Sequence, residues 1–257
     1  MIQKKEIIQH FQKLGLKSGD LVLVHSSWYR ALDRDVKSPK EIIDALLEVV
    51  GEKGTIIFPT FNFDFSTYGK DFDVINTLSE MGILTNLALK YYESIRTLDP
   101  VYSFAIIGFM RNELGNITYS NSYGSNSMFA RIKELDGKIM CIGIDDYDKW
   151  MTFFHHIEEM QQVPYRYLKR FSGNIIDENR IKKRIDIFLY VRKLEDGVKP
   201  ELNQMGYILE KENIIKIVNI GKSKVRLMNS REVYDRTVKE MISNPCILMQ
   251  YSKNNTS

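Results

Sequence analysis

The sequence predicts an α/β protein in which short buried strands alternate with amphipathic helices. Residues 20–27 (DLVLVHSS) and 54–61 (GTIIFPTF) are tight apolar runs of strand length, bounded by turn residues. Between them, residues 39–54 (PKEIIDALLEVVGEKG) have helical spacing, with Pro39 in the first turn and Gly51 placed to end the helix. A strand, helix, strand order is typical of α/β layering, in which ligands bind beyond the carboxyl ends of strands.

The other elements follow from the same reasoning along the chain. Residues 1–20 place Ile7, Phe11 and Leu14 at helical spacing without a long apolar stretch, which predicts a folded amphipathic helix and not a signal peptide. A polar, aromatic-rich segment at residues 62–77 is long enough to be a lid or an acceptor-binding loop. Further helices are expected at residues 80–94, 127–135, 152–162 and 230–243, and further strands at residues 101–109, 138–144, 184–191 and 213–228.

Length and composition are those of an ordinary globular protein. We expect one domain over residues 1–257, with residues 165–228 as a candidate subsidiary sheet. The 36 basic and 33 acidic residues leave a net charge of +3, which favours neither a nucleic-acid nor a membrane partner. No window approaches the ~20 apolar residues needed to cross a bilayer. The basic runs at 166–171 (RYLKRF) and 180–184 (RIKKR) are each interpreted as a solvated face.

Two cysteines, Cys141 and Cys246, are present, and they lack CxxC spacing. That pattern predicts neither a zinc cage nor a disulfide framework and suits a reducing cytoplasm. The sequence also lacks the GxGxxG and GxxxxGK[ST] phosphate loops, which weakens dinucleotide and kinase interpretations. We expect a small-molecule ligand, a cytoplasmic location and either a monomer or a homodimer.

The stretch 150-WMTFFHHIEEMQQVPYRYLKRF-171 holds two of the four histidines, next to two glutamates. On a helix, residues three or four apart share a face, so His155 is expected beside Thr152, Glu158 and Glu159, with His156 turned away. A carboxylate beside an imidazole can fix its tautomer and stabilise the imidazolium, which is the usual arrangement for a general base. A purely structural His-Glu pair remains an alternative from spacing alone.

The sequence gives less support to two other chemistries, a metal site and a nucleophilic residue. A zinc site would need three or four ligands at characteristic spacings, and neither HExxH nor a cysteine cluster is present, so no metal is expected. A nucleophile would be Ser26, Ser27 or Cys141, but the sequence contains no GxSxG elbow. Cys141 lies within a predicted strand and is interpreted as a small buried hydrophobic residue.

Several segments, in order along nearly the whole chain, resemble the aminoglycoside 3-N-acetyltransferase family. The resemblance is carried by 15-GLKSGDLVLVHSSW-28, 45-ALLEVVGEKGTIIFPTF-61, 81-MGILT-85, 96-RTLDPVYSFAIIG-108, 124-GSNS-127, 152-TFFHHIE-158 and 164-PYRYLK-169. The last two match the family's Thr-x-x-His-x-x-Glu pattern and its continuation. The resemblance implies an α/β/α fold around a mixed central sheet. It also implies transfer of an acetyl group from acetyl-CoA to a primary amine by direct attack, without an acyl-enzyme.

Residue roles follow from this resemblance. His155 would be the base and Glu158 its partner, while Thr152 would contact the thioester end of the cofactor or support the histidine. The cofactor would bind to Ser26, Ser27 and Trp28 at the end of the first strand, with Ser103, Phe104, Ala105 and Ser127 completing the groove. The donors that stabilise the oxyanion are not identified by the sequence.

The departures from the family pattern concern the acceptor. The family's His-Pro is Asp99-Pro100 here, and the acidic loop that gathers a polycationic drug is reduced to Asp64, Asp71 and Asp73. A polycation favours an acidic cleft. Basic residues instead follow the active helix, among them Arg166, Lys169 and Arg170. With Asp64, Arg166 and Lys169 as expected acceptor contacts, we hypothesise a phosphate-bearing amino sugar, such as a nucleotide-linked one used in surface polysaccharide synthesis, in place of an antibiotic.

Two alternatives to an acetyltransferase stay open. A non-catalytic protein of the same fold that binds CoA or a sugar would keep the groove and tolerate loss of His155. A metal-dependent hydrolase would contain metal and lose activity with chelators.

Overall fold

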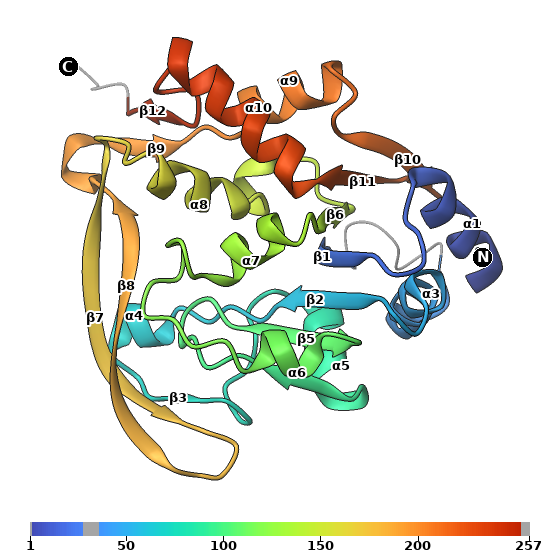
Figure 1. The fold of residues 1–257 in the computed structure, drawn as a ribbon, viewed down its shortest axis with the longest axis horizontal. Coiled ribbons are helices and arrows are strands. Elements are labelled where there is room, and N and C mark those ends of the chain that lie inside the picture. The colour runs from blue at the N-terminus through green and yellow to red at the C-terminus, as the bar shows by residue number, and fades with distance from the viewer. Residues whose placement is uncertain (1, 28–35, 253–257) are drawn as a thin grey trace.

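The structure is a computed structural model that describes residues 2–27 and 36–252 (Figure 1). It confirms the predicted fold class, because a mixed central sheet lies between layers of helices. The α-helices are α1 Lys4–Leu14, α3 Pro39–Val50, α4 Asp64–Tyr68, α5 Ile83–Tyr91, α6 Arg111–Gly115, α7 Met128–Glu134, α8 Phe153–Met160, α9 Asn203–Lys211 and α10 Ser230–Ser243, with 3-10 turns η1 Tyr147–Lys149 and η2 Leu194–Asp196.

The central sheet has the strand order β10-β11-β6-β1-β2-β5-β4. Its strands are β1 Leu21–Ser26, β2 Thr55–Pro59, β4 Ser94–Arg96, β5 Phe104–Gly108, β6 Lys138–Ile142, β10 Lys216–Ile220 and β11 Ser223–Asn229. Strand β1 runs parallel to both β2 and β6, whereas the outer strands pair antiparallel. The carboxyl ends of β1, β2 and β6 therefore meet at one edge of the sheet, where a ligand cavity is expected.

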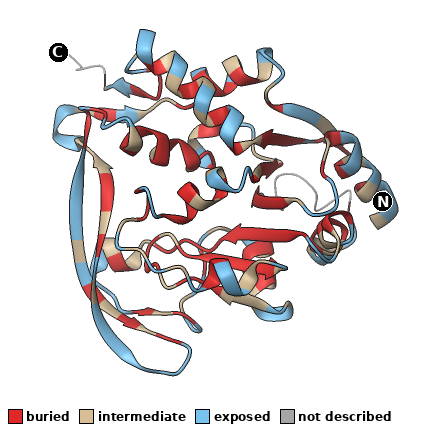
Figure 2. Cartoon of the chain, viewed as in Figure 1, coloured by how far each residue is buried: buried red, intermediate tan, exposed pale blue. Residues whose placement is uncertain are grey.

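Alternate residues of these strands face two separate cores. On β1, Val22 and Val24 pack with helices α1, α3 and α5, while Leu21 and Leu23 pack with α7 to α10. This period of two, with both faces apolar, is the pattern of a sheet buried between helical layers. In Figure 2 the inner strands β11, β6, β1, β2 and β5 are buried for most of their length, whereas the edge strand β10 is largely exposed. Helix α8, the predicted active helix, packs in the second of these cores through Phe153, Phe154 and Ile157.

A second, three-stranded sheet lies beside the central one and consists of β3 Phe72–Asp73, β7 Arg166–Ile176 and β8 Lys182–Arg192. Strands β7 and β8 form a long hairpin that stands at one side of the molecule, next to α4 (Figure 1). Much of its surface is exposed (Figure 2). A short pair, β9 Val198–Pro200 with β12 Met249–Tyr251, completes the strands of the described residues.

The structure corrects three details of the sequence prediction. Residues 165–228 do not form one subsidiary sheet, because only the hairpin of β7 and β8 is separate, whereas β10 and β11 extend the central sheet. The single strand expected at 213–228 is a hairpin that turns at Gly221, whose φ of 59° favours glycine. Strand β7 and helix α9 were not predicted, since a half-exposed hairpin strand rich in basic residues lacks a clear apolar period.

Two absences can be stated for the part of the chain that the structure describes. None of its helices combines the length and apolar character needed to span a membrane. Within the same ranges, no group of three or more His, Cys, Asp or Glu side chains is arranged to hold a metal ion.

Candidate active site

His155 and Glu158 meet on α8 as predicted from their spacing. The Nδ1 atom of His155 lies 2.8 Å from Oε2 of Glu158. The side chain of Glu158 is completely buried, whereas that of His155 keeps 20% of its surface exposed at a cavity. The amphipathic helix explains this arrangement: its apolar face packs in the core and turns His155 toward the cavity.

Arg166, the first residue of β7, completes this cluster from the hairpin. Its Nη2 atom lies 2.8 Å from Oε2 of Glu158 and 3.0 Å from Nδ1 of His155. Its Nη1 atom donates to the carbonyl of Tyr190 on β8 at 2.9 Å. The guanidinium is therefore used to hold Glu158 and the base of the hairpin. The sequence predicted that Arg166 contacts the acceptor, which stays a prediction. Arg166 lines the cavity in front of His155 and is also paired with Glu158.

The charges in this cluster fix the protonation states. Burial, followed by the positive charge of Arg166, lowers the pKa of His155, and the Glu158 carboxylate only partly opposes this. Burial alone would raise the pKa of Glu158, but the charge of Arg166 and the hydrogen bond from His155 hold it below its usual value. A neutral imidazole that donates Nδ1–H to an ionised carboxylate leaves Nε2 as its proton acceptor.

The side chains of His156, Glu159 and Thr152, close to His155 in the sequence, form hydrogen bonds with groups other than the His155 ring. His156 is buried and its Nδ1 donates to the carbonyl of Tyr123 at 2.6 Å, and burial lowers its pKa to about 4. Glu159 accepts a hydrogen bond from Asn121. The hydroxyl of Thr152 donates to the carbonyl of Trp150 at 3.3 Å, so the expected support of His155 by this hydroxyl is not seen.

A cavity of about 620 Å³ opens in front of His155, and we call it the histidine cavity. Its walls come from α8, the α4 region and the β7–β8 hairpin. Its aromatic lining consists of Phe63, Tyr102, Tyr123, Tyr167, Phe171 and Tyr190, and its charged lining of Arg166, Lys169, Arg192 and Glu195. Lys169 thus lies where the sequence predicted. Arg192 was missed, because only the pairing of β7 with β8 brings it to this place.

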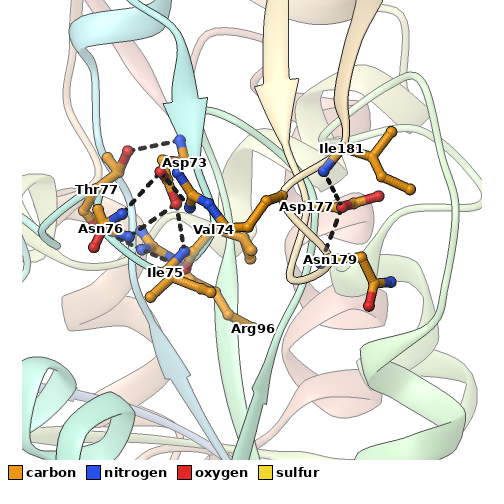
Figure 3. Close-up of polar contacts among 10 residues, drawn as sticks. Asp73, Val74, Ile75, Asn76, Thr77, Arg96, Asp177, Asn179 and Ile181 are labelled. Carbon is orange, nitrogen blue, oxygen red and sulfur yellow. Dashed lines mark hydrogen bonds and ion pairs between the residues drawn. The ribbon is translucent and has the colours of Figure 1, made fainter.

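The acidic residues expected to gather the acceptor are paired with basic side chains. Asp64 forms an ion pair with Lys70 at 2.9 Å and does not line the histidine cavity. The other two loop carboxylates attach the loop to the tip of the hairpin, in the pairs Asp71–Lys182 at 2.5 Å and Asp73–Arg180 at 2.7 Å. Figure 3 shows Asp73 surrounded by the loop amides that it binds.

A second cavity, of about 310 Å³, lies at the carboxyl ends of β1 and β2, and we call it the serine cavity. It is lined by His25, Ser26, Ser27, Pro59, Glu80, Met81, Gly82, Ile83, Ile144, Lys149 and Trp150. The two serines therefore lie where the sequence predicted a groove. Trp28, the third residue of that prediction, lies outside the described residues. Lys149 and Trp150 were missed, since they come from a turn more than a hundred residues away in sequence.

Four residues predicted to complete the cofactor groove are fully buried and line neither cavity. Ser103 donates to the carbonyl of Thr60 at 2.9 Å and accepts from Arg96 at 3.1 Å. Phe104 and Ala105 pack in the two cores. Ser127 caps α7 by accepting from the amide of Ala130 at 3.3 Å. These buried residues support the fold, and their contact with a cofactor stays a prediction.

Cys141 lies within β6, and its thiol is buried, as interpreted from the sequence. Burial raises the pKa of this thiol strongly, so it is not a thiolate at neutral pH.

Two chain segments contribute to both cavities. Pro59 lines the serine cavity and Phe63, four positions on, lines the histidine cavity. In the same way Trp150 lines the serine cavity and His155 the histidine cavity.

Comparison with known proteins shows which family the chain resembles. A family model described as aminoglycoside 3-N-acetyltransferase matches residues 23–242. An aminoglycoside N(3')-acetyltransferase-like protein, YokD of Bacillus subtilis (strain 168), is 26% identical, covering 94% of this chain and 93% of its own length. Aminoglycoside N(3)-acetyltransferase IV of Salmonella sp is 23% identical, covering 96% and 90%.

Solved structures show the same fold. The crystal structure of aminoglycoside acetyltransferase AAC(3)-Xa superposes with a TM-score of 0.79 at 20% identity, covering 93% of this chain and 92% of that one. The structure of AAC-IIIb with CoASH has a TM-score of 0.78 at 18% identity, covering 94% and 97%. The resemblance found in the sequence is confirmed by the family match. The chain belongs to the aminoglycoside 3-N-acetyltransferase family, whose members are acetyl-CoA-dependent N-acetyltransferases.

Proposed function

We propose that this protein moves the acetyl group of acetyl-CoA to a primary amine of an amino sugar, with His155 as general base. The observation that carries this proposal is the bond from His155 to the buried Glu158, at the wall of a cavity large enough for a sugar. The names of the relatives, which are aminoglycoside N-acetyltransferases, support an amino sugar as the acceptor class.

The chemistry requires the nitrogen to lose two protons, because an alkylammonium ion has no lone pair with which to attack a thioester. In the proposed reaction, the ammonium first releases one proton to solvent. Nε2 of His155 then takes a proton from the neutral amine as its nitrogen bonds to the thioester carbon and the carbonyl oxygen becomes an oxyanion. The carbon–sulfur bond then breaks, and the proton held by the imidazolium is available to the departing CoA thiolate. A well-placed base of this kind contributes a rate factor of ~100 to 10,000.

Glu158 and Arg166 have opposite effects on that base. The carboxylate fixes the Nδ1–H tautomer and stabilises the imidazolium, while the guanidinium keeps the imidazole neutral before the reaction. Arg166 also keeps Glu158 ionised inside the protein, where an unpaired carboxylate would be costly. We therefore propose His155 as the catalytic residue, with Glu158 and Arg166 as positioning residues.

We place acetyl-CoA in the serine cavity, with its thioester end toward the histidine cavity. Ser26, Ser27 and Lys149 offer donors there, and Gly82 opens α5 without a side-chain cap, which leaves backbone amides of its first turn for an anionic or carbonyl group. Two buried ring nitrogens beside the cavity, Nε2 of His25 and Nε1 of Trp150, have no hydrogen-bond partner among the described residues. Such atoms fit a site completed by a bound polar ligand.

The decisive experiment is a thiol-release assay with acetyl-CoA and a panel of amino sugars. We expect His155→Ala to lower kcat by at least ~100-fold while acetyl-CoA still raises the Tm, because the donor cavity is separate. His10→Ala, on the surface helix α1, is the matched control and should keep full activity. If His155→Ala turns over as fast as the wild type, the assigned base is wrong. If the wild type binds acetyl-CoA but acetylates no amine, a non-catalytic binding protein is favoured.

A further inference from the structure

Two arginines face each other at the base of the hairpin, where β7 and β8 reach the histidine cavity. Arg166 and Arg192 are directly opposite in the antiparallel register, and both line the cavity. Like charges in this position are unfavourable unless an anion lies close to them. Glu158 supplies that anion for Arg166 at 2.8 Å.

Arg192 lacks a corresponding anion. Among the residues that the structure describes, no carboxylate lies within ion-pair distance of its guanidinium, although the side chain is half-buried. Burial, and then the charge of Arg166, lower the pKa of Arg192. A half-buried cation beside a second cation at the wall of a cavity is an arrangement that an anionic ligand would stabilise.

Lys169 adds a second unpaired positive charge to the lining of the same cavity. It lies three residues beyond Arg166 on β7, its side chain is exposed, and its Nζ atom lies 5.1 Å from the centre of the Phe171 ring. No ion pair of Lys169 is found within the described ranges. In the register of the two strands Lys169 is opposite Leu189, three positions along from Arg192, and it points to the other face of the hairpin. Lys169 therefore adds positive charge to the cavity lining at a separate place from Arg192.

The negative charges near this cavity do not offset these cations. Arg166 is paired with Glu158, which leaves Lys169 and Arg192 facing a single lining carboxylate, Glu195. The loop carboxylates that could attract a polycation, Asp64, Asp71 and Asp73, are already in ion pairs with Lys70, Lys182 and Arg180. A polycationic acceptor would therefore meet a wall of its own charge sign, whereas an anionic acceptor would be attracted.

We infer that the acceptor is an anionic amino sugar whose phosphate group binds at Arg192 while its amine faces His155, with Lys169 adding positive charge to the same cavity. This inference rests on the proposed function and adds the substrate class. A planar guanidinium binds a phosphate through two parallel hydrogen bonds, and a lysine adds a point charge. A carboxylate on the sugar could bind to the same guanidinium, so the test includes acceptors with a phosphate and an acceptor with a carboxylate.

The test compares kcat/KM for five acceptors: a plain aminohexose, its phosphate monoester, a nucleoside-diphosphate-linked aminohexose, an aminohexuronic acid and a kanamycin-type aminoglycoside. We expect the phosphorylated acceptors to exceed the plain aminohexose by about 10- to 100-fold, since charge-assisted hydrogen bonds have that effect. A carboxylate acceptor as good as the phosphates would overturn the choice of phosphate. An aminoglycoside preferred over every anionic acceptor would overturn the whole inference.

The variants separate this anion site from general damage. Arg192→Glu should lower the ratio of kcat/KM for the phosphorylated aminohexose to kcat/KM for the plain aminohexose by about 100-fold. Arg170→Glu is the matched control, because Arg170 lies on the same strand but does not line the cavity, and its guanidinium lies 3.7 Å from Asp186. An equal loss with both acceptors in Arg192→Glu would contradict a phosphate site.

A binding measurement distinguishes failure of this inference from failure of the proposed function. The phosphorylated aminohexose is titrated by calorimetry into the wild type and Arg192→Glu without acetyl-CoA. Binding that is lost in the variant supports the anion site even if no amine is ever acetylated. Acetylation of plain amino sugars, without any preference for phosphate in rate or binding, would support the catalytic role and overturn the anion site.

Discussion

The serine cavity and the histidine cavity are built from different parts of the molecule. The serine cavity lies at the carboxyl ends of β1 and β2, in the central sheet whose residues are buried from both sides. One wall of the histidine cavity is formed by the buried helix α8. The other wall is the β7–β8 hairpin, which belongs to a separate and largely exposed sheet (Figure 2). In the proposed mechanism, donor binding and the base belong to the core, whereas contacts with the acceptor come from a peripheral hairpin. The first residue of that hairpin, Arg166, is paired with Glu158, so only hairpin positions beyond it can change charge without reaching the His155–Glu158 pair.

The largest effect is expected at the core side of this comparison. Glu158→Gln removes the charge that stabilises the His155 imidazolium and leaves the buried Arg166 without its anion. We expect kcat to fall by about 100-fold, and the free energy of unfolding to fall by about 3 kcal/mol, measured by urea denaturation. Glu159→Gln, one residue on, is the control and should retain activity. Comparable losses in both variants would show that α8 responds to any polar change and not to loss of this pair.

The two buried histidines of the core should make the protein sensitive to acid. Burial lowers the pKa of His25 to about 3 and that of His156 to about 4, from 6.5. Because the folded-state values are lowered, the contribution to stability is complete above pH 6.5 and is lost as the pH falls toward 4. Between pH 7 and pH 5, each histidine should cost about 2 kcal/mol of unfolding free energy.

Urea denaturation at the two pH values measures this loss. His156→Gln, which can still donate to the carbonyl of Tyr123, should reduce the difference between pH 7 and pH 5 by about 2 kcal/mol. A wild-type protein equally stable at both pH values would mean that these histidines are not held neutral by burial.

The smallest effect is expected at the hairpin tip. Asp71→Asn weakens an exposed ion pair with Lys182, and such pairs contribute little. We expect KM for the acceptor to rise by at most about threefold, because the hairpin is held less firmly, while KM for acetyl-CoA stays unchanged. Steady-state kinetics with each substrate varied in turn measures both constants. A rise confined to acetyl-CoA would contradict the separation of the two cavities.

Local relations in the sequence were enough to predict the central sheet and part of the site. His155 and Glu158 were paired correctly because three residues on a helix fix their relative position. Ser26 and Ser27 were placed correctly because they end a strand that is buried and parallel to its neighbours. These predictions needed only the period of an element and its direction.

Relations between distant segments could not be predicted in this way. Arg192 joins the histidine cavity through the register of β8 against β7, which no local pattern specifies. Ser103 and Ser127 were assigned to a cofactor groove but are buried, because whether a strand end or a helix cap is covered depends on what packs over it. The role of Arg166 was missed for the same reason, since its partner Glu158 lies on another element.

The central claim is that His155 is the general base and that its surroundings keep it neutral. The most direct measurement is the pH dependence of kcat/KM for wild type and His155→Ala. Deprotonation of the acceptor amine affects both profiles equally, so the two proteins can be compared directly. We predict that the wild type shows an acidic limb with a midpoint below 6.5, the ordinary value, and that His155→Ala lacks it. An acidic limb at the same midpoint in His155→Ala would contradict the assignment.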